Sequence, residues 1–371
     1  MKLFSFTTVK DEADIIESFV RYNLNILDGM VISDNCSNDN TDEILLKLKK
    51  EGLNIYLLRD ENAYFDQTIK RQYLMDYTFN EFDPDIVFPL DADEFIAAKN
   101  GKNPRELIEK LDSNMFYRYQ FQNFVIDKDD NLSELFIPNR IVNRRVLKDN
   151  KGLGYKSIIM KKVYNAGINL QMGGHNLRSK ETDSIIESII IDDLFLAHYP
   201  VRGKYQLMNK VIAGRLNNSS LHSRSEGLGF HQYDILDEII NHGTISDDTL
   251  LKISKYYGVS PLIKRVSVRN MPLSVSFCNN IKIKYSNNNY DQALLSNVIK
   301  TSEVIIDRMR INSEDLNKEI AMLRQKILEL EKQIETLKFD NNQILNSKSW
   351  KITKPLRMVS KIIRGKNNER K

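Results

Sequence analysis

Short apolar runs alternate with helix-like patterns over the first hundred residues, and this order restricts the fold more than any other feature. The run Leu3 to Val9 has the length of a strand, and Asp11 to Leu27 has apolar residues at close to helical spacing with acids at its start. Further strands are expected at 30–33, 54–58 and 85–90, and further helices at 42–50 and 67–79. This alternation is typical of βαβ units. It predicts an α/β protein with a Rossmann-like, mostly parallel sheet flanked by helices.

Composition narrows the class of protein. With 371 residues, 41% hydrophobic and 28% charged, the chain is long enough for two or three folded units, and wholesale disorder is excluded. A net charge of +4 is too small to indicate a nucleic-acid-binding protein. Cys36 and Cys278 form no CxxC pair, which excludes a disulfide framework and a thiolate zinc site. Because neither a secretion signal nor an apolar run of about 18 residues is present, we expect a cytoplasmic protein.

The pattern changes along the chain and suggests four parts. Residues 1–203 form the α/β domain, in which mainly antiparallel strands are expected from about 115 to 200. Residues 204–310 are expected to be a mainly helical accessory region with one strand at 280–285. Residues 311–346 have a heptad pattern, and residues 347–371 form a basic amphipathic tail.

The heptads predict a coiled coil. Apolar residues recur every seven positions in two sets, with one Asn among them: Ile320, Ile327, Ile334 and Asn341 at a, and Leu316, Leu323, Leu330, Leu337 and Ile344 at d. Ile at a, Leu at d and one Asn at a favour a parallel two-stranded coil. The sequence therefore predicts a homodimer.

The tail has the composition of a surface anchor. Residues 348–371 contain nine Lys or Arg and one acid, and Trp350 lies among them. A segment with bases on one side and Trp and Ile on the other suits an anionic membrane surface. We therefore expect a cytoplasmic protein that associates peripherally with the inner face of the plasma membrane, and a disordered tail or a tail that binds a protein partner is the alternative.

Two acids follow a buried strand directly. Asp91 and Asp93 come after the apolar run 85–90, where the carboxyl end of a strand meets the usual ligand site of an open α/β sheet. Two carboxylates one residue apart can hold a divalent cation and leave positions for phosphate oxygens. His198 follows another apolar strand and can complete such a shell, with His175 as the rival. A Mn²⁺ or Mg²⁺ site is expected.

Three motifs in order resemble family 2 glycosyltransferases of the GT-A fold. They are Thr8 to Glu12, Val31 to Thr41 and Pro89 to Phe95, and the last resembles the bacterial branch that carries a DxDEF sequence. The resemblance covers roughly residues 1 to 215. One departure is that Asn35-Cys36-Ser37 stands where Asp-Gly-Ser is commoner. The segment 349–357 also resembles the ends of bacterial polysaccharide glycosyltransferases.

The resemblance implies a nucleotide-sugar donor and a glycan or lipid-linked glycan acceptor. Asp34 takes the position that contacts the base, and Asp91 and Asp93 take those that hold the metal and the diphosphate. The candidate donor-binding residues are Thr8, Lys10, Glu12, Asp34, Arg71, Asp91, Arg202 and Lys204, and the candidate metal ligands are Asp91, Asp93 and His198.

The expected activity is metal-dependent, inverting transfer of a sugar to a cell-surface polysaccharide or glycolipid. Such a transfer needs a base, and the sequence leaves this base open between Glu94 and Asp127. A nucleotidyltransferase is one alternative, although no Gly-rich phosphate loop follows the first strand. A non-catalytic coiled-coil scaffold with a degenerate GT-A domain is the other, and the presence of both Asp91 and Asp93 argues against it.

Overall fold

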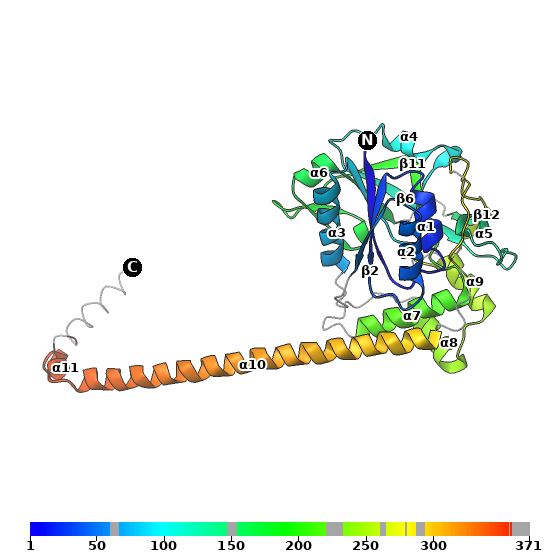
Figure 1. The fold of residues 1–371 in the computed structure, drawn as a ribbon. Coiled ribbons are helices and arrows are strands. Elements are labelled where there is room, and N and C mark those ends of the chain that lie inside the picture. Colours follow the sequence, from blue (N-terminus) through cyan, green and yellow to red (C-terminus); the bar gives the residue numbers. More distant parts are fainter. Residues whose placement is uncertain are drawn as a thin grey trace. The chain divides into compact units, whose positions relative to one another are not determined.

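The computed structural model describes residues 1–59, 67–146, 154–219, 233–259, 265–278, 280–286, 294–355 and 357. By its internal contacts the chain divides into two compact units, Met1–Ile306 and Asp307–Lys371. The first unit contains a sheet of ten strands with helices on both sides (Figure 1). The α/β class predicted from the sequence, with a mostly parallel sheet flanked by helices, is confirmed, and a long helix spans the segment predicted to form a coiled coil.

The amino-terminal strands form the parallel part of this sheet. They are β1 (Leu3–Val9), β2 (Gly29–Asp34), β3 (Ile55–Arg59) and β4 (Ile86–Pro89), in the order β4-β1-β2-β3. Helix α3 (Gln67–Phe82) lies on one side of these strands, and α1 (Ile16–Asn23) and α2 (Thr41–Lys50) lie on the other (Figure 1). Since all four strands run in one direction, their carboxyl ends meet at the same edge.

Antiparallel strands extend the sheet, as the turn-rich sequence predicts. β8 (Tyr155–Met160) pairs antiparallel with β4 and β6 (Tyr117–Val125), and β7 (Asn143–Val146) lies between β6 and β12 (Ser267–Asn270). β11 (Ile189–His198) is antiparallel to β5 (Glu94–Ala98) but parallel to β6, so that His198 pairs with Asn123. β6 and β11 therefore also end at one edge.

Shorter elements complete this part of the chain. They are η1 (Lys99–Gly101), α4 (Pro104–Ile108), α5 (Ile137–Arg140), α6 (Lys161–Asn165), β9 (Ile168–Leu170), η3 (Met172–Gly174) and β10 (Leu177–Ser179). Aromatic rings pack beneath the strand ends: Phe95 of β5 makes an edge contact with Tyr199, with 5.2 Å between ring centroids, and Phe124 stacks on Tyr199 at 4.6 Å. All three rings are buried, and so they fix the ends of β5, β6 and β11 relative to one another.

The region after residue 203 is mainly helical, as predicted. It contains α7 (Lys204–Ser219), α8 (Tyr233–His242) and α9 (Asp247–Tyr256), which share a small apolar core that includes Leu207, Val211 and Ile235. The prediction of a strand at 280–285 is wrong, because residues 280–286 form no strand. Among the described residues of this region, the strand is β12. The backbone amides of 284–286 bond instead to the carboxylate of Glu17 at 2.7 to 2.9 Å. The domain boundaries at 203 and 310 stay predictions.

A single helix spans the heptads. α10 (Leu294–Asn346) is followed by the short α11 (Lys348–Ile352), whose first turn is capped by Ser347. Large apolar side chains of the predicted seam are exposed, for example Ile327 at 55% and Ile334 at 50%. The coiled coil itself stays a prediction.

Part of the basic tail lies outside the described residues. This part includes five bases: Lys361, Arg364, Lys366, Arg370 and Lys371. Among the described helices, none is long and apolar enough to span a membrane.

Candidate functional site

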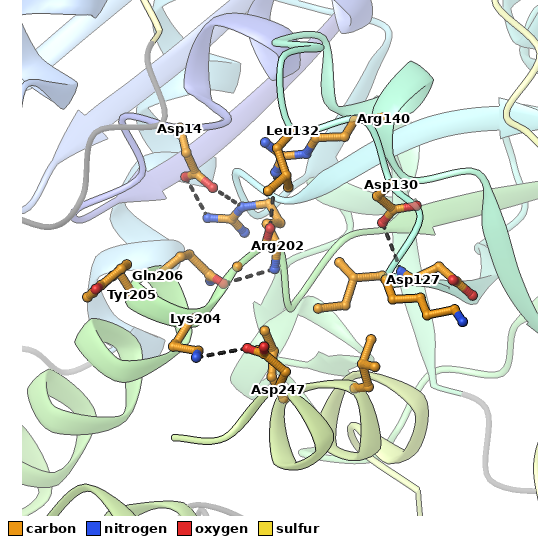
Figure 2. Close-up of a pocket in the computed structure, with 15 residues that line it drawn as sticks. Asp14, Asp127, Asp130, Leu132, Arg140, Arg202, Lys204, Tyr205, Gln206 and Asp247 are labelled. Carbon is orange, nitrogen blue, oxygen red and sulfur yellow. Dashed lines mark hydrogen bonds and ion pairs between the residues drawn. The ribbon is translucent and has the colours of Figure 1, made fainter. Parts of the chain in front are cut away.

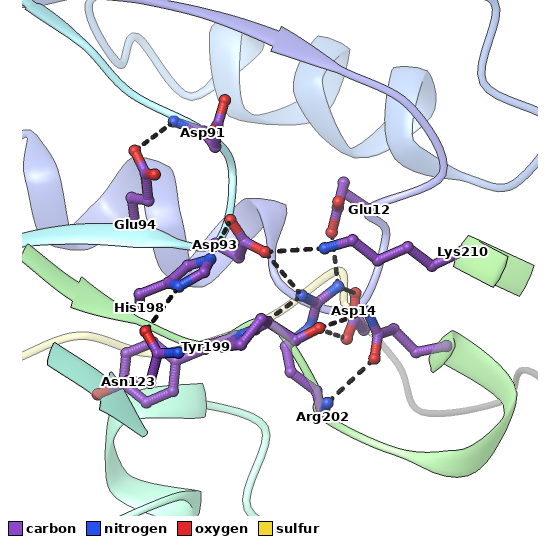
Figure 3. A network of polar contacts seen from close by, with 12 residues as sticks. Glu12, Asp14, Asp91, Asp93, Glu94, Asn123, His198, Tyr199, Arg202 and Lys210 are labelled. Carbon is purple, nitrogen blue, oxygen red and sulfur yellow. Dashed lines mark hydrogen bonds and ion pairs between the residues drawn. The ribbon is translucent and has the colours of Figure 1, made fainter. Parts of the chain in front are cut away.

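The candidate site lies where β1, β2 and β4 end beside β6 and β11. β4 ends at Pro89, and Asp91 to Glu94 follow in a turn closed by a bond from the Glu94 amide to the Asp91 carbonyl. β11 ends at His198, and the Tyr199 amide donates to the Asp93 carbonyl at 2.9 Å. This bond joins the acidic turn to the end of β11 and brings Asp93 and His198 together (Figure 3).

Asp93, Glu94 and His198 form the cluster that fits a metal. One ligand atom of each lies within 4.8 Å of the other two, and Nε2 of His198 is 3.6 Å from Oδ1 of Asp93. Nδ1 of His198 lies 3.0 Å from the amide oxygen of Asn123, to which it donates. Nε2 is the ring nitrogen that faces the Asp93 carboxylate, where the two side chains can bind a cation between them. Asp93, Glu94 and His198 therefore suit a divalent cation.

Asp91 has a different setting from Asp93. Arg71 of α3 forms an ion pair with Oδ1 of Asp91, and Nζ of Lys156 lies 2.8 Å from Oδ2. Burial opposes the ionisation of Asp91, but Arg71 and Lys156 outweigh it and lower the pKa of this carboxyl. The Asp91 side chain is 36% exposed. Asp91 thus pairs with two cationic side chains next to the cluster of Asp93, Glu94 and His198.

Glu94 is buried next to Asp91 and Lys156. It is 1% exposed, its two oxygens lie 2.9 to 3.0 Å from Nζ of Lys156, and the Asp91 amide donates to it at 2.8 Å. Burial raises the pKa of Glu94 to about 8, although Lys156 acts in the opposite direction. The other candidate base, Asp127, lies in the loop after β6, where its oxygens accept from Asp129 and Asn143 at 3.3 and 3.4 Å.

Arg202 links the segment after β1 to the cluster that contains Asp93. Its guanidinium donates to Asp14 at 2.5 and 2.8 Å and to Glu12 at 2.5 Å, and Nη1 lies 3.9 Å from Asp93. Arg202 is 3% exposed, and in this structure its guanidinium pairs with carboxylates of the protein. Burial raises the pKa of Glu12 to about 7 against the pull of Arg202. Lys204, the other predicted diphosphate cation, pairs with Asp247 of α9 at 2.8 Å.

The loops after β1 and β2 are bonded to each other. Nζ of Lys10 donates to the carbonyl of Cys36 at 2.8 Å, and Asp34 accepts from the hydroxyl of Ser37 at 2.5 Å and from its amide at 3.2 Å. Asp34 therefore caps this turn, and its contact with a base stays a prediction. Oγ1 of Thr8 is buried and has no hydrogen-bond partner among the described residues.

Cys36 stands in the turn after β2 with φ +53°, in the left-handed region where glycine is favoured. A residue other than glycine in this conformation costs about 1 kcal/mol.

His175 lies in a glycine turn on the same side of the molecule. Its Nδ1 is 2.7 Å from the carbonyl of Tyr155, and its ring packs at the edge of Phe121. Gly173 has φ +70°, and a Cβ there would lie 2.4 Å from the imidazole, so this turn needs glycine. His175 does not belong to the cluster of Asp93, Glu94 and His198.

Replacing His198 by Ala is expected to weaken Mn²⁺ affinity about 10- to 100-fold, because one ligand of the cluster is lost. His175→Ala is the matched control and should change this affinity less than threefold. Calorimetric titration of Mn²⁺ in the presence of a nucleoside diphosphate measures both. The opposite order of effects would assign the ligand to His175.

Two residues of the site were absent from the sequence prediction. Asn123 lies on β6, and Lys210 of α7 places Nζ 3.1 Å from Oδ2 of Asp93. Neither has a local sequence signal, because Asn123 reaches the site through the pairing of distant strands and Lys210 through the packing of α7. Burial opposes the ionisation of Asp93, but Lys210, His198 and Arg202 lower its pKa.

Comparisons with known proteins give similarity to solved structures only. No family model and no curated protein matches the chain. TarS 1-349 of S. aureus is 14% identical over 65% of this chain and 71% of that chain, with a TM-score of 0.34. The mannosyltransferase PcManGT from Pyrobaculum calidifontis, in complex with GDP-Man and Mn²⁺, is 12% identical over 58% and 62%, with a TM-score of 0.34. GalNAc-T7 with UDP, GalNAc and Mn²⁺ is 9% identical over 68% and 56%, with a TM-score of 0.31. Since scores of this size carry no functional argument, function is inferred from the site residues.

Proposed function

We propose that the protein is a metal-dependent glycosyltransferase that moves a sugar from a nucleoside-diphosphate sugar to a glycan or glycolipid acceptor. One observation carries the proposal: the ligand atoms of Asp93, Glu94 and His198 converge beside the cations that Asp91 holds. The order of the three family motifs along the chain supports it.

The position of each residue indicates its role in this reaction. Asp93 and His198 would hold Mn²⁺ or Mg²⁺, which acts as a Lewis acid on the leaving diphosphate. Asn123 orients the imidazole through Nδ1. Arg71 and Lys156 neutralise phosphate charge next to Asp91. Thr8, Lys10, Glu12 and Asp34 line the loops on the nucleotide side, and the inverting outcome remains part of the proposal.

Asp127 is the better placed candidate for the base. Glu94 is almost fully buried and its two oxygens are already bonded to Lys156 and to the Asp91 amide. Asp127 is exposed, lines an open cavity and lies on a loop that follows β6. A carboxylate that faces such a cavity can reach the hydroxyl of an acceptor.

Product analysis tests the function. The full chain is incubated with a panel of nucleotide sugars and Mn²⁺, Mg²⁺ or a chelator, and the products are identified by mass spectrometry. A glycosyltransferase releases a nucleoside diphosphate in the presence of metal. A nucleotidyltransferase would release pyrophosphate instead, and a scaffold would leave every donor intact.

The homodimer is part of the proposal, and charges beside the seam support a parallel, in-register pair. In such a pair each g residue meets the following e residue of the second copy. Glu319 would then meet Arg324, and Lys326 would meet Glu331, both with opposite charge. Membrane association of the tail stays a prediction.

Replacing Ile327 by Asp is expected to convert a dimer into a monomer, because it places a carboxylate in the middle of the apolar seam. Gln325→Asp, at an outward position two residues away, should leave the dimer intact. Sedimentation at micromolar concentration separates these outcomes. An unchanged oligomer of the Ile327 variant would place the interface elsewhere.

A further inference from the structure

A cavity of about 520 Å³ lies next to the candidate metal ligands, beyond the ends of β6 and β11 (Figure 2). Its walls are the loop around Asp127 and Asp130, the start of α7 and the first turns of α9. Arg202 lines the cavity and lies 3.9 Å from Asp93, so one guanidinium separates the cavity from the metal cluster. The volume falls in the range of about 300 to 1,000 Å³ that is usual for small-molecule sites.

The cavity differs in position from most of the residues expected to bind the donor. Thr8, Lys10, Glu12, Asp34 and Asp91 follow β1, β2 and β4. Arg202 and Lys204 follow β11 and line the cavity, where they pair with Asp14 and Asp247. The lining of the cavity comes mainly from the loop after β6 and from α9. A reaction between two substrates needs both beside the metal, and these two segments carry none of the residues expected to bind the donor.

The lining chemistry indicates an uncharged ligand rich in hydroxyl groups. Acidic and basic side chains are equally represented: Asp14, Asp127, Asp130 and Asp247 face Lys128, Arg140, Arg202 and Lys204. Two opposite pairs neutralise each other, since Lys204 pairs with Asp247 at 2.8 Å and Arg202 pairs with Asp14. Asp127 and Asp130 are outside these pairs, and carboxylates accept bonds from hydroxyls. Ile126, Leu250 and Leu251 add an apolar wall, against which the C–H face of a sugar ring packs.

We propose that this cavity binds the acceptor, as an uncharged terminal sugar whose hydroxyl points past Arg202 toward the metal cluster. This proposal rests on the proposed glycosyltransferase function and adds the place and chemical class of the second substrate. Asp127 lines the same cavity, which makes it the candidate base for this acceptor.

Gly203 offers a direct test. It lines the cavity, its φ is outside the left-handed region, and a Cβ built on it meets no atom within 4 Å. A larger side chain therefore enters the cavity without backbone strain. The series Gly203→Ala, Gly203→Leu and Gly203→Phe should raise the acceptor KM progressively, by about tenfold or more for Leu. Leu251→Trp fills the cavity from α9 and should have the same effect, which keeps the test valid if one variant folds poorly.

Lys252→Trp is the matched control, because Lys252 is exposed beside Leu251 and does not line the cavity. The measurement pairs acceptor kinetics, with neutral and anionic oligosaccharides as acceptors, with calorimetric affinity for the nucleoside diphosphate. We expect acceptor KM to rise in the filling variants while nucleotide affinity stays within twofold. An unchanged acceptor KM in enzymes that bind and turn over donor overturns the acceptor site alone, and so does a preference for the anionic acceptors. No donor binding or turnover in the wild type overturns the proposed function instead.

Discussion

Replacing Asp93 by Asn is expected to lower the rate of sugar transfer by about 10³-fold or more, since a metal ion contributes several kcal/mol to a transition state with developing charge. Asn keeps the size of the side chain and removes its charge. Asp93 is the acid that faces His198, Lys210 and Arg202 together, at 3.6, 3.1 and 3.9 Å. Its loss removes a metal ligand and leaves Lys210 and Arg202 without the anion that they share.

Asp192→Asn is the control for Asp93, because Asp192 is an exposed carboxylate on β11, the strand that carries His198. Its transfer rate should match that of the wild type. Transfer is measured as nucleoside diphosphate released per enzyme at saturating Mn²⁺, with circular dichroism to verify the fold. Near-normal transfer by the Asp93 variant in chelator-treated buffer would exclude Asp93 as a required metal ligand.

Replacing Arg202 by Met is expected to lower the free energy of unfolding by about 3 to 5 kcal/mol, because it leaves buried carboxylates without their cation. Arg202 and Asp14 are each about 1% exposed in their side chains, and Glu12 completes the group. Since Arg202 joins the loop after β1 to the end of β11, its loss also separates these two segments.

Lys204→Met is the matched control, two residues along the chain. Lys204 also forms an ion pair, but its partner Asp247 is 84% exposed in its side chain. Water screens such a pair, so its loss should lower the free energy of unfolding by less than about 1 kcal/mol. Urea unfolding followed by near-ultraviolet circular dichroism compares the two. Equal effects would mean that Arg202 contributes no more than a surface pair.

The amino-acid sequence by itself determined the α/β class and the place of the acidic turn. Apolar runs such as 85–90 require burial, and the period of the intervening segments distinguishes helix from strand, so these features follow from local chemistry. Asp91 and Asp93 follow their strand directly, and chain continuity alone places them at its carboxyl end. The heptad pattern of α10 likewise follows from the local sequence.

Only the tertiary structure decided which side chains meet this turn. His198 was predicted as a ligand from its position after a strand. The contacts of Asn123 with His198 and of Lys210 with Asp93 were not predicted, because β6 and α7 are distant in sequence from the acidic turn. The fold also separated the two acids: Asp91 holds Arg71 and Lys156, whereas Asp93 faces His198. Spacing in a sequence records the order of residues along a strand. The partners across a sheet depend on strand pairing and register, which distant apolar contacts determine.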